Sequence, residues 1–87
     1  MSSHHIALFT FTLGGTASIG PQALRALWAK VSGIGNVSVG RKESYGSSRP
    51  VYTLYAPQSL GNLQDVELRL RRALEDAHLH ASVTALH

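Results

Sequence analysis

The residues of this sequence best suited to chemistry lie in two glycine-rich segments. The first is GGTASIG at 14–20, where backbone N–H groups ahead of a helix start could hold an anion. It lacks the Gly-Lys-Ser/Thr ending of a phosphate-binding P-loop, so nothing here supports nucleotide hydrolysis. An ordinary glycine-rich turn explains the same residues, and we favour that simpler interpretation because turns demand glycine.

The second segment is a serine- and glycine-rich hairpin tip at 44–48, flanked by basic residues. Arg41, Lys42 and Arg49 could grip phosphates while Tyr45 stacks on a base, so nucleic-acid contact is one hypothesis. A solvated hairpin whose charged edge discourages aggregation is the simpler interpretation, and we favour it. The Lys/Arg-Gly-Phe run of RNA-recognition modules is missing from the sequence.

The histidines do not form a recognisable set. They are His4, His5, His78, His80 and His87. If the first and last strands are neighbours, His5 comes near His87, but two terminal histidines are too few for a metal site. His78 and His80 could act as general bases, since imidazole titrates near neutrality, yet no acidic or hydroxyl partner is spaced beside them. We therefore predict no catalytic residue, no metal and no cofactor.

Composition bounds the class of protein. The chain has 87 residues, 44% hydrophobic and 15% charged, which predicts a single domain over 1–87. A net charge of +3 permits an acidic partner without demanding one. There is no cysteine, no apolar run of membrane-spanning length and no signal-peptide pattern, so we expect a cytoplasmic protein without a membrane partner.

Hydrophobic periodicity predicts six elements. Two-residue alternation predicts strands at 5–13, 36–42, 50–56 and 80–86. A helix should begin at Pro21 and end near Gly33 or Gly35, with an apolar stripe of Leu24, Leu27, Trp28 and Val31. A second amphipathic helix runs from Leu63 to Ala77, and its solvated face carries the i, i+4 pairs Asp65–Arg69 and Glu67–Arg71.

The order of these elements predicts an α+β fold. We expect a ferredoxin-like βαββαβ two-layer sandwich, with two helices on one face of a four-stranded antiparallel sheet and the strand order 4-1-3-2. In the first strand, Phe9, Phe11 and Leu13 should be buried, while Leu8, Thr10 and Thr12 line the other face. Proteins cover that second face with another copy, a ligand or a nucleic acid.

Two families resemble parts of the chain. Residues 14–56, with a glycine-rich turn, an amphipathic helix and GIGNV at 33–37 before a strand, resemble ACT-type regulatory domains. Those are βαββαβ modules that pair their sheets and often bind small amino acids. The resemblance implies Gly14, Gly15, Gly20 and Asn36 as ligand contacts.

The second resemblance covers residues 5–42. HIALFTF at 5–11 and VSVGR at 37–41 look like stress-responsive dimeric α/β barrel proteins, some of which are cofactor-free cyclases using histidine and tyrosine. Only His5 matches that pattern.

Three functional hypotheses follow. The leading one is a small non-enzymatic binding or regulatory module that acts by dimerisation or by docking on a larger protein. The first alternative is a cofactor-free dimeric barrel enzyme, with His5, Tyr52, Tyr55 and His78 as its candidate groups. The second alternative is nucleic-acid binding through the basic hairpin.

Overall fold

The chain folds into one four-stranded antiparallel sheet and two helices, an α+β architecture. The computed structural model describes residues 5–14, 18–43 and 50–86. The strands are β1 (His5–Leu13), β2 (Ser38–Glu43), β3 (Pro50–Pro57) and β4 (Ala81–Ala85). They lie in the order β2-β3-β1-β4, and every neighbouring pair is antiparallel. Counted from the other edge this is the expected order, 4-1-3-2, with strand ends shifted by one or two residues.

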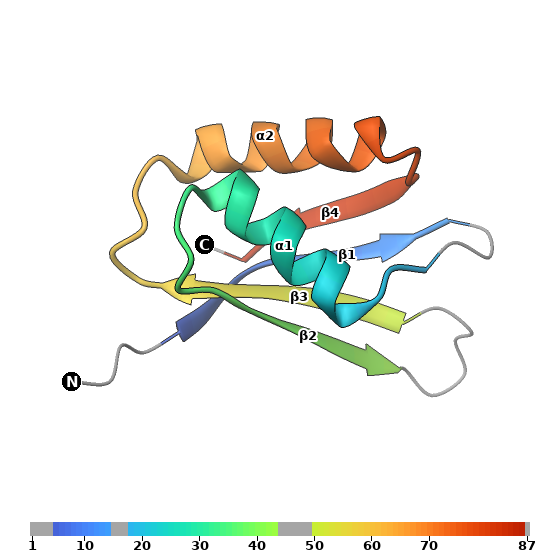
Figure 1. Cartoon of the computed structure of the whole chain (residues 1–87), viewed down its shortest axis with the longest axis horizontal. Helices are drawn as coiled ribbons and strands as arrows, with labels where there is room; N and C mark the ends of the chain where they lie inside the picture. The colour runs from blue at the N-terminus through green and yellow to red at the C-terminus, as the bar shows by residue number, and fades with distance from the viewer. Residues whose placement is uncertain (1–4, 15–17, 44–49, 87) are drawn as a thin grey trace.

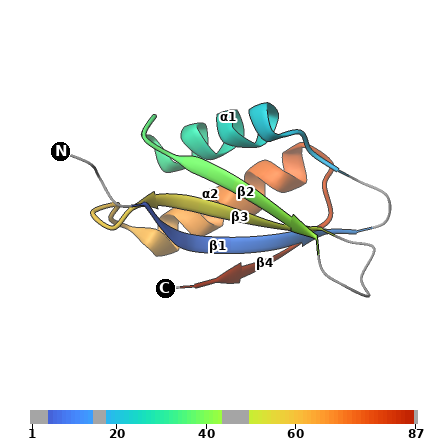
Figure 2. The same ribbon diagram turned by 90° about the horizontal axis from the view of Figure 1, so that it is seen from below.

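Two helices, α1 (Pro21–Ser32) and α2 (Leu63–Asp76), lie on the same side of the sheet (Figures 1 and 2). Pro21 stands at the start of α1, where its missing N–H leaves no bond unmade. Gly33, with a φ of 79°, ends α1 in the left-handed conformation that glycine adopts without a steric penalty. The predicted apolar stripe is confirmed, since Leu24, Trp28 and Val31 are buried.

The C-terminal end of α2 has the same hydrogen-bond pattern as a Schellman motif. The Leu79 N–H bonds to the Leu74 carbonyl at 2.9 Å, and the His78 N–H bonds to the Glu75 carbonyl at 2.9 Å. This geometry puts His78 at a φ of 58°, a left-handed position usually occupied by glycine. A side chain there costs about 1–2 kcal/mol in backbone strain.

The core between the helices and the sheet contains two aromatic pairs among aliphatic side chains. The rings of Phe9 and Trp28 meet edge to face with centroids 5.9 Å apart, and those of Phe11 and Tyr52 stack at 5.0 Å. The indole N–H of Trp28 donates to the Tyr55 carbonyl at 2.9 Å, so the one polar atom of this buried ring is satisfied.

One burial prediction for β1 is wrong, because the strand is irregular. The pairing of β1 with β3 shifts between Ala7 and Phe9, leaving Leu8 as an extra residue in the ladder. Leu8 is 2% exposed and Phe9 is fully buried, so two consecutive residues belong to the core. Strict alternation places Leu8 on the open face, and the bulge moves it to the helix-covered face. Thr10 and Thr12 remain on the open face as expected.

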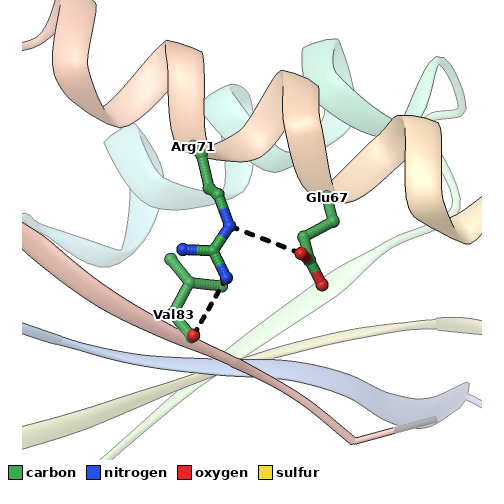
Figure 3. Close-up of polar contacts among 3 residues, drawn as sticks. All are labelled: Glu67, Arg71 and Val83. Atoms are coloured by element: carbon green, nitrogen blue, oxygen red, sulfur yellow. Dashed lines mark hydrogen bonds and ion pairs between the residues drawn. The ribbon is translucent and has the colours of Figure 1, made fainter.

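Arg71 connects α2 to the edge strand β4 through a hydrogen bond. Its guanidinium contacts the Glu67 carboxylate at 3.4 Å and donates to the Val83 carbonyl at 3.3 Å (Figure 3). The predicted pair between Asp65 and Arg69 is also present, at 3.1 Å. Because β4 is an edge strand, a cation on one of its outward carbonyls discourages pairing with another strand at that point.

Within the described ranges, the structure contains no helix long and apolar enough to cross a membrane.

Candidate binding face and its polar network

The sheet face opposite the helices is the first candidate site. We call it the open face and define it by the strand residues that alternate with the buried ones and are not buried themselves. They are His5, Ala7, Thr10, Thr12, Ser38, Gly40, Lys42, Val51, Thr53, Tyr55, Pro57, Ser82 and Thr84. Lys42 is the only formally charged side chain in this set, and it lies near the end of an edge strand.

Threonine residues run across the centre of the open face. Thr10 of β1 is paired with Thr53 of β3 on one side and with Thr84 of β4 on the other. Threonine fits a pleated, half-buried surface well, and its hydroxyl can donate and accept. The centre of this face is therefore uncharged and able to form hydrogen bonds in both senses.

Tyr55 lies beside this threonine row and covers a glycine. A Cβ added to Gly40 would meet Tyr55 Cε2 at 3.2 Å and the Tyr55 hydroxyl at 3.6 Å. The ring therefore lies against the backbone of β2, in the space that a side chain at position 40 would fill. A glycine at this position lets the aromatic ring lie close to the sheet.

A three-residue polar network lies at the end of the sheet where β1 begins. Ser38 Oγ is 2.9 Å from His5 Nδ1, and Asn36 Oδ1 is 2.9 Å from His5 Nε2. An amide oxygen only accepts, so Nε2 donates to Asn36, and in neutral imidazole Nδ1 accepts the Ser38 hydroxyl proton. The hydrogen-bond partners thus assign the tautomer. His5 and Ser38 are half-buried, and Asn36 is exposed.

The network spans a strand. His5 belongs to β1 and Ser38 to β2, and β3 lies between them in the sheet. His5 is opposite Pro57 of β3, and Ser38 is opposite Tyr55, two positions further along the same strand. The imidazole therefore crosses β3 on the open face to reach Ser38, the β2 residue opposite Tyr55.

The glycines and the asparagine predicted as ligand contacts do not form one site. Gly20 precedes α1 and has nothing within 4 Å of its added Cβ, while the Gly14 N–H donates to the His80 carbonyl at 2.7 Å. Asn36 follows the other end of α1, a helix of 12 residues, and therefore about 18 Å away along the axis. Gly15 lies outside the described residues.

The basic residues predicted to contact nucleic acid are also separated. Arg41 is opposite Tyr52, a core residue, whereas Lys42 is opposite Val51 of the open face. Consecutive residues of a strand point to opposite faces, so these two cations cannot contact one surface side by side. Tyr45 and Arg49 lie outside the described residues.

Arg41 instead lines a hollow of about 190 Å³ at the start of α1, together with Ile19, Pro21 and Tyr52. One residue of each predicted segment, Arg41 of the basic hairpin and Ile19 of the helix start, thus lies beside this hollow. The Ile19 N–H already points to the Tyr52 hydroxyl at 3.4 Å.

The histidine and tyrosine residues named for an enzyme fall into two groups: His5 and Tyr55 share the open face, whereas Tyr52 and His78 lie elsewhere. Tyr52 is 1% exposed and stacks on Phe11, and His78 ends α2. A hollow of about 380 Å³ beside β4 includes His80, Glu75 and Arg71 but no tyrosine. Only His5 takes part in a side-chain network, through two residues that the histidine analysis did not pair with it. No group of three or more His, Cys, Asp or Glu in the described part of the chain could hold a metal ion.

Comparisons with known proteins found no relative of this chain. No protein-family model, no curated protein and no solved structure matches this chain. The functional argument therefore rests on its own residues and geometry.

Proposed function

We propose that this protein is a small ferredoxin-like binding or regulatory module of the cytoplasm that pairs with a second copy through the open face. The βαββαβ element order, the strand order and the placement of both helices on one side support the ferredoxin-like assignment. The observation that carries the functional proposal is the composition of the open face, whose centre has no charge and is covered by no element in the described part of the chain.

Symmetry explains why an uncharged face suits self-pairing. In a two-fold dimer each patch meets its own copy, so every charge near the axis faces an equal charge. Threonine hydroxyls do not have this problem, since each can donate to its copy or accept from it. The open face satisfies this condition over Thr10, Thr53 and Thr84.

The helix side of the molecule does not meet this condition of an uncharged centre. A groove of about 610 Å³ between α1 and α2 has an apolar floor of Leu27, Val31 and Ala73. Its lining also includes three cations and one acid: Lys30, Arg69, Arg72 and Asp76. A second copy placed there would bring two basic rims together, which is unfavourable for self-association. The same charges make that groove a poorer surface for a second copy than the open face.

The size of the open face predicts a weak dimer. Four strands about 4.8 Å apart and about 20 Å long give a footprint of roughly 400 Å² per copy. Stable interfaces bury about 800 Å² of accessible surface per partner, so we expect micromolar rather than nanomolar association. Dimerisation at this strength depends on concentration and is open to regulation.

Sedimentation velocity from 5 to 500 µM, on the order of the expected dissociation constant, tests the proposal. We expect a concentration-dependent shift from monomer to dimer. Thr53→Arg places a cation at the centre of the face and should weaken association at least tenfold. Gln64→Arg adds the same charge on an exposed turn of α2 and should leave association unchanged. A monomer throughout the range, or equal weakening by both variants, would contradict the proposal.

A further inference from the structure

We propose that Ser38, His5 and Asn36 form an acyl-transfer site that accepts activated acyl groups, namely aryl esters and thioesters. The inference rests on the polar network and not on dimerisation. Its pattern is a nucleophile within hydrogen-bond reach of a base that a third group orients. Both links of the chain, from Ser38 to His5 and from His5 to Asn36, measure 2.9 Å.

The reaction has two balanced steps. The Ser38 Oγ attacks the acyl carbon as its proton passes to His5 Nδ1, and the imidazolium then returns that proton to the departing phenolate or thiolate. This forms the Oγ–acyl bond and breaks the bond to the leaving group. In the second step, water attacks the acyl carbon of the acyl-serine and gives a proton to His5. His5 then passes a proton to Ser38 Oγ as its bond to the acyl group breaks, and a carboxylic acid leaves.

Asn36 is a positioning residue in this scheme. Its amide oxygen holds the Nε2–H and so keeps Nδ1 unprotonated and directed at Ser38. Without that contact the imidazole could adopt the other tautomer, which presents a donor to the serine and cannot accept its proton. Asn36 therefore decides which imidazole nitrogen accepts the serine proton. This role can be tested separately from any contribution of Asn36 to folding.

The geometry limits the class of substrate. We assign no oxyanion hole to the site, and a single oxyanion-hole donor is worth about 10²–10³ in rate. General base catalysis alone supplies about 10²–10⁴, too little to cleave an amide or an alkyl ester at a useful rate. An aryl ester or a thioester carries a stable leaving group, so the attack of serine on it needs the least assistance.

The position of the site allows such substrates to enter. Ser38 begins an edge strand and is half-buried, and Asn36 is exposed in the segment just before it. The network lies at one end of the open face, away from the central threonine row. A substrate can therefore reach Ser38 while the acyl chain lies against neutral strand residues such as Ala7 and Tyr55.

p-Nitrophenyl acetate with the full-length protein tests the proposal. We expect a burst of nitrophenolate and, after acid quenching, one acetyl group on the peptide that contains Ser38. Ser38→Ala should abolish that label, and His5→Ala should slow its formation by about 10²-fold or more. His80→Gln removes an exposed histidine elsewhere in the molecule and should change neither result, which accounts for hydrolysis by free imidazole.

Two variants of Asn36 separate positioning from structure. Asn36→Asp puts a carboxylate on the same nitrogen, which stabilises the imidazolium formed in the reaction, so acylation should become several times faster. Asn36→Leu removes the acceptor and should slow it at least tenfold. A purely structural asparagine would give equal acylation rates in both variants once each is shown to be folded by circular dichroism.

The proposal is wrong if Ser38 is not acetylated, or if His5→Ala acetylates it as fast as the wild type. It is also wrong if the label falls on lysines or on Ser82, an exposed serine that hydrogen-bonds to none of the histidines the structure describes. The Thr53→Arg variant distinguishes this inference from self-pairing, because it should lose association and keep the acylation of Ser38.

Discussion

On one side of β1, Phe11 and Leu13 are at most 3% exposed, whereas Thr10 and Thr12, interleaved with them on the other side, remain partly open. The same contrast holds along β3, where Tyr52 and Leu54 are buried and Thr53 is not. The covered face is apolar, and the open face consists mostly of small and hydroxyl-bearing residues. Both faces are built from the same strands, by residues that alternate from one position to the next.

The difference separates stability from function. Burial of apolar surface is the main favourable term in folding, and nearly all of it lies between the sheet and the helices. Changes on the covered face should therefore alter the free energy of unfolding, while changes on the open face should alter association or chemistry. Each prediction below tests one side of that division.

The largest effect is expected at the bulge. Leu8→Ala should lower the free energy of unfolding by about 2–5 kcal/mol, because it empties space in a packed core. Thr10→Ala, two positions along the same strand and facing outward, should lower it by less than about 1 kcal/mol. Chemical denaturation followed by Trp28 fluorescence measures both. Equal losses would mean that Leu8 is not a core residue and that the bulge does not place its side chain on the covered face.

An intermediate effect of opposite sign is expected where α2 ends. His78→Gly should raise the free energy of unfolding by about 1 kcal/mol, since glycine adopts the left-handed conformation without strain. The converse change, Gly33→Ala at the end of α1, should lower it by a similar amount. Thermal unfolding of the two variants provides the check. Neither change touches the open face, so dimer dissociation constants should remain at the wild-type value.

The periodicity of the sequence was sufficient for the architecture. Alternating and helical patterns predicted all six elements, the antiparallel sheet and the i, i+4 ion pairs of α2. Strict alternation did not predict the bulge at Leu8, because it assumes one phase along the whole strand, whereas an inserted residue shifts that phase by one position. Strand ends were displaced for the usual reason that end residues carry little periodic signal.

The candidate sites depended on register, which sequence alone does not fix. His5 and Ser38 are 33 residues apart and meet only because β1 and β2 flank the same strand. A histidine at the first position of a strand, and Asn36 and Ser38 around the start of another, were the available signals. Arg41 and Lys42 illustrate the opposite case, since neighbours in sequence face opposite sides of the sheet.

The smallest effect is expected for Gly40→Ala, beneath the Tyr55 ring. The new Cβ would lie 3.2 Å from Cε2, so the ring must move by a few tenths of an ångström. On the covered face such a change would be costly, because packed side chains surround every atom. Tyr55 contacts position 40 with its far end, on a face without covering helices, and can swing outward.

Alanine also restricts the unfolded chain more than glycine does, a gain of about 0.4–1 kcal/mol where the native backbone accepts it. We therefore expect Gly40→Ala to raise the free energy of unfolding of the monomer by about 0.5 kcal/mol. The displaced ring should at the same time project from the open face. We therefore expect the dimer dissociation constant, measured by sedimentation velocity, to rise several-fold. A loss of more than about 1 kcal/mol would instead show that the Tyr55 ring is held as rigidly as a core side chain. The two faces would then differ in composition but not in how tightly they are packed.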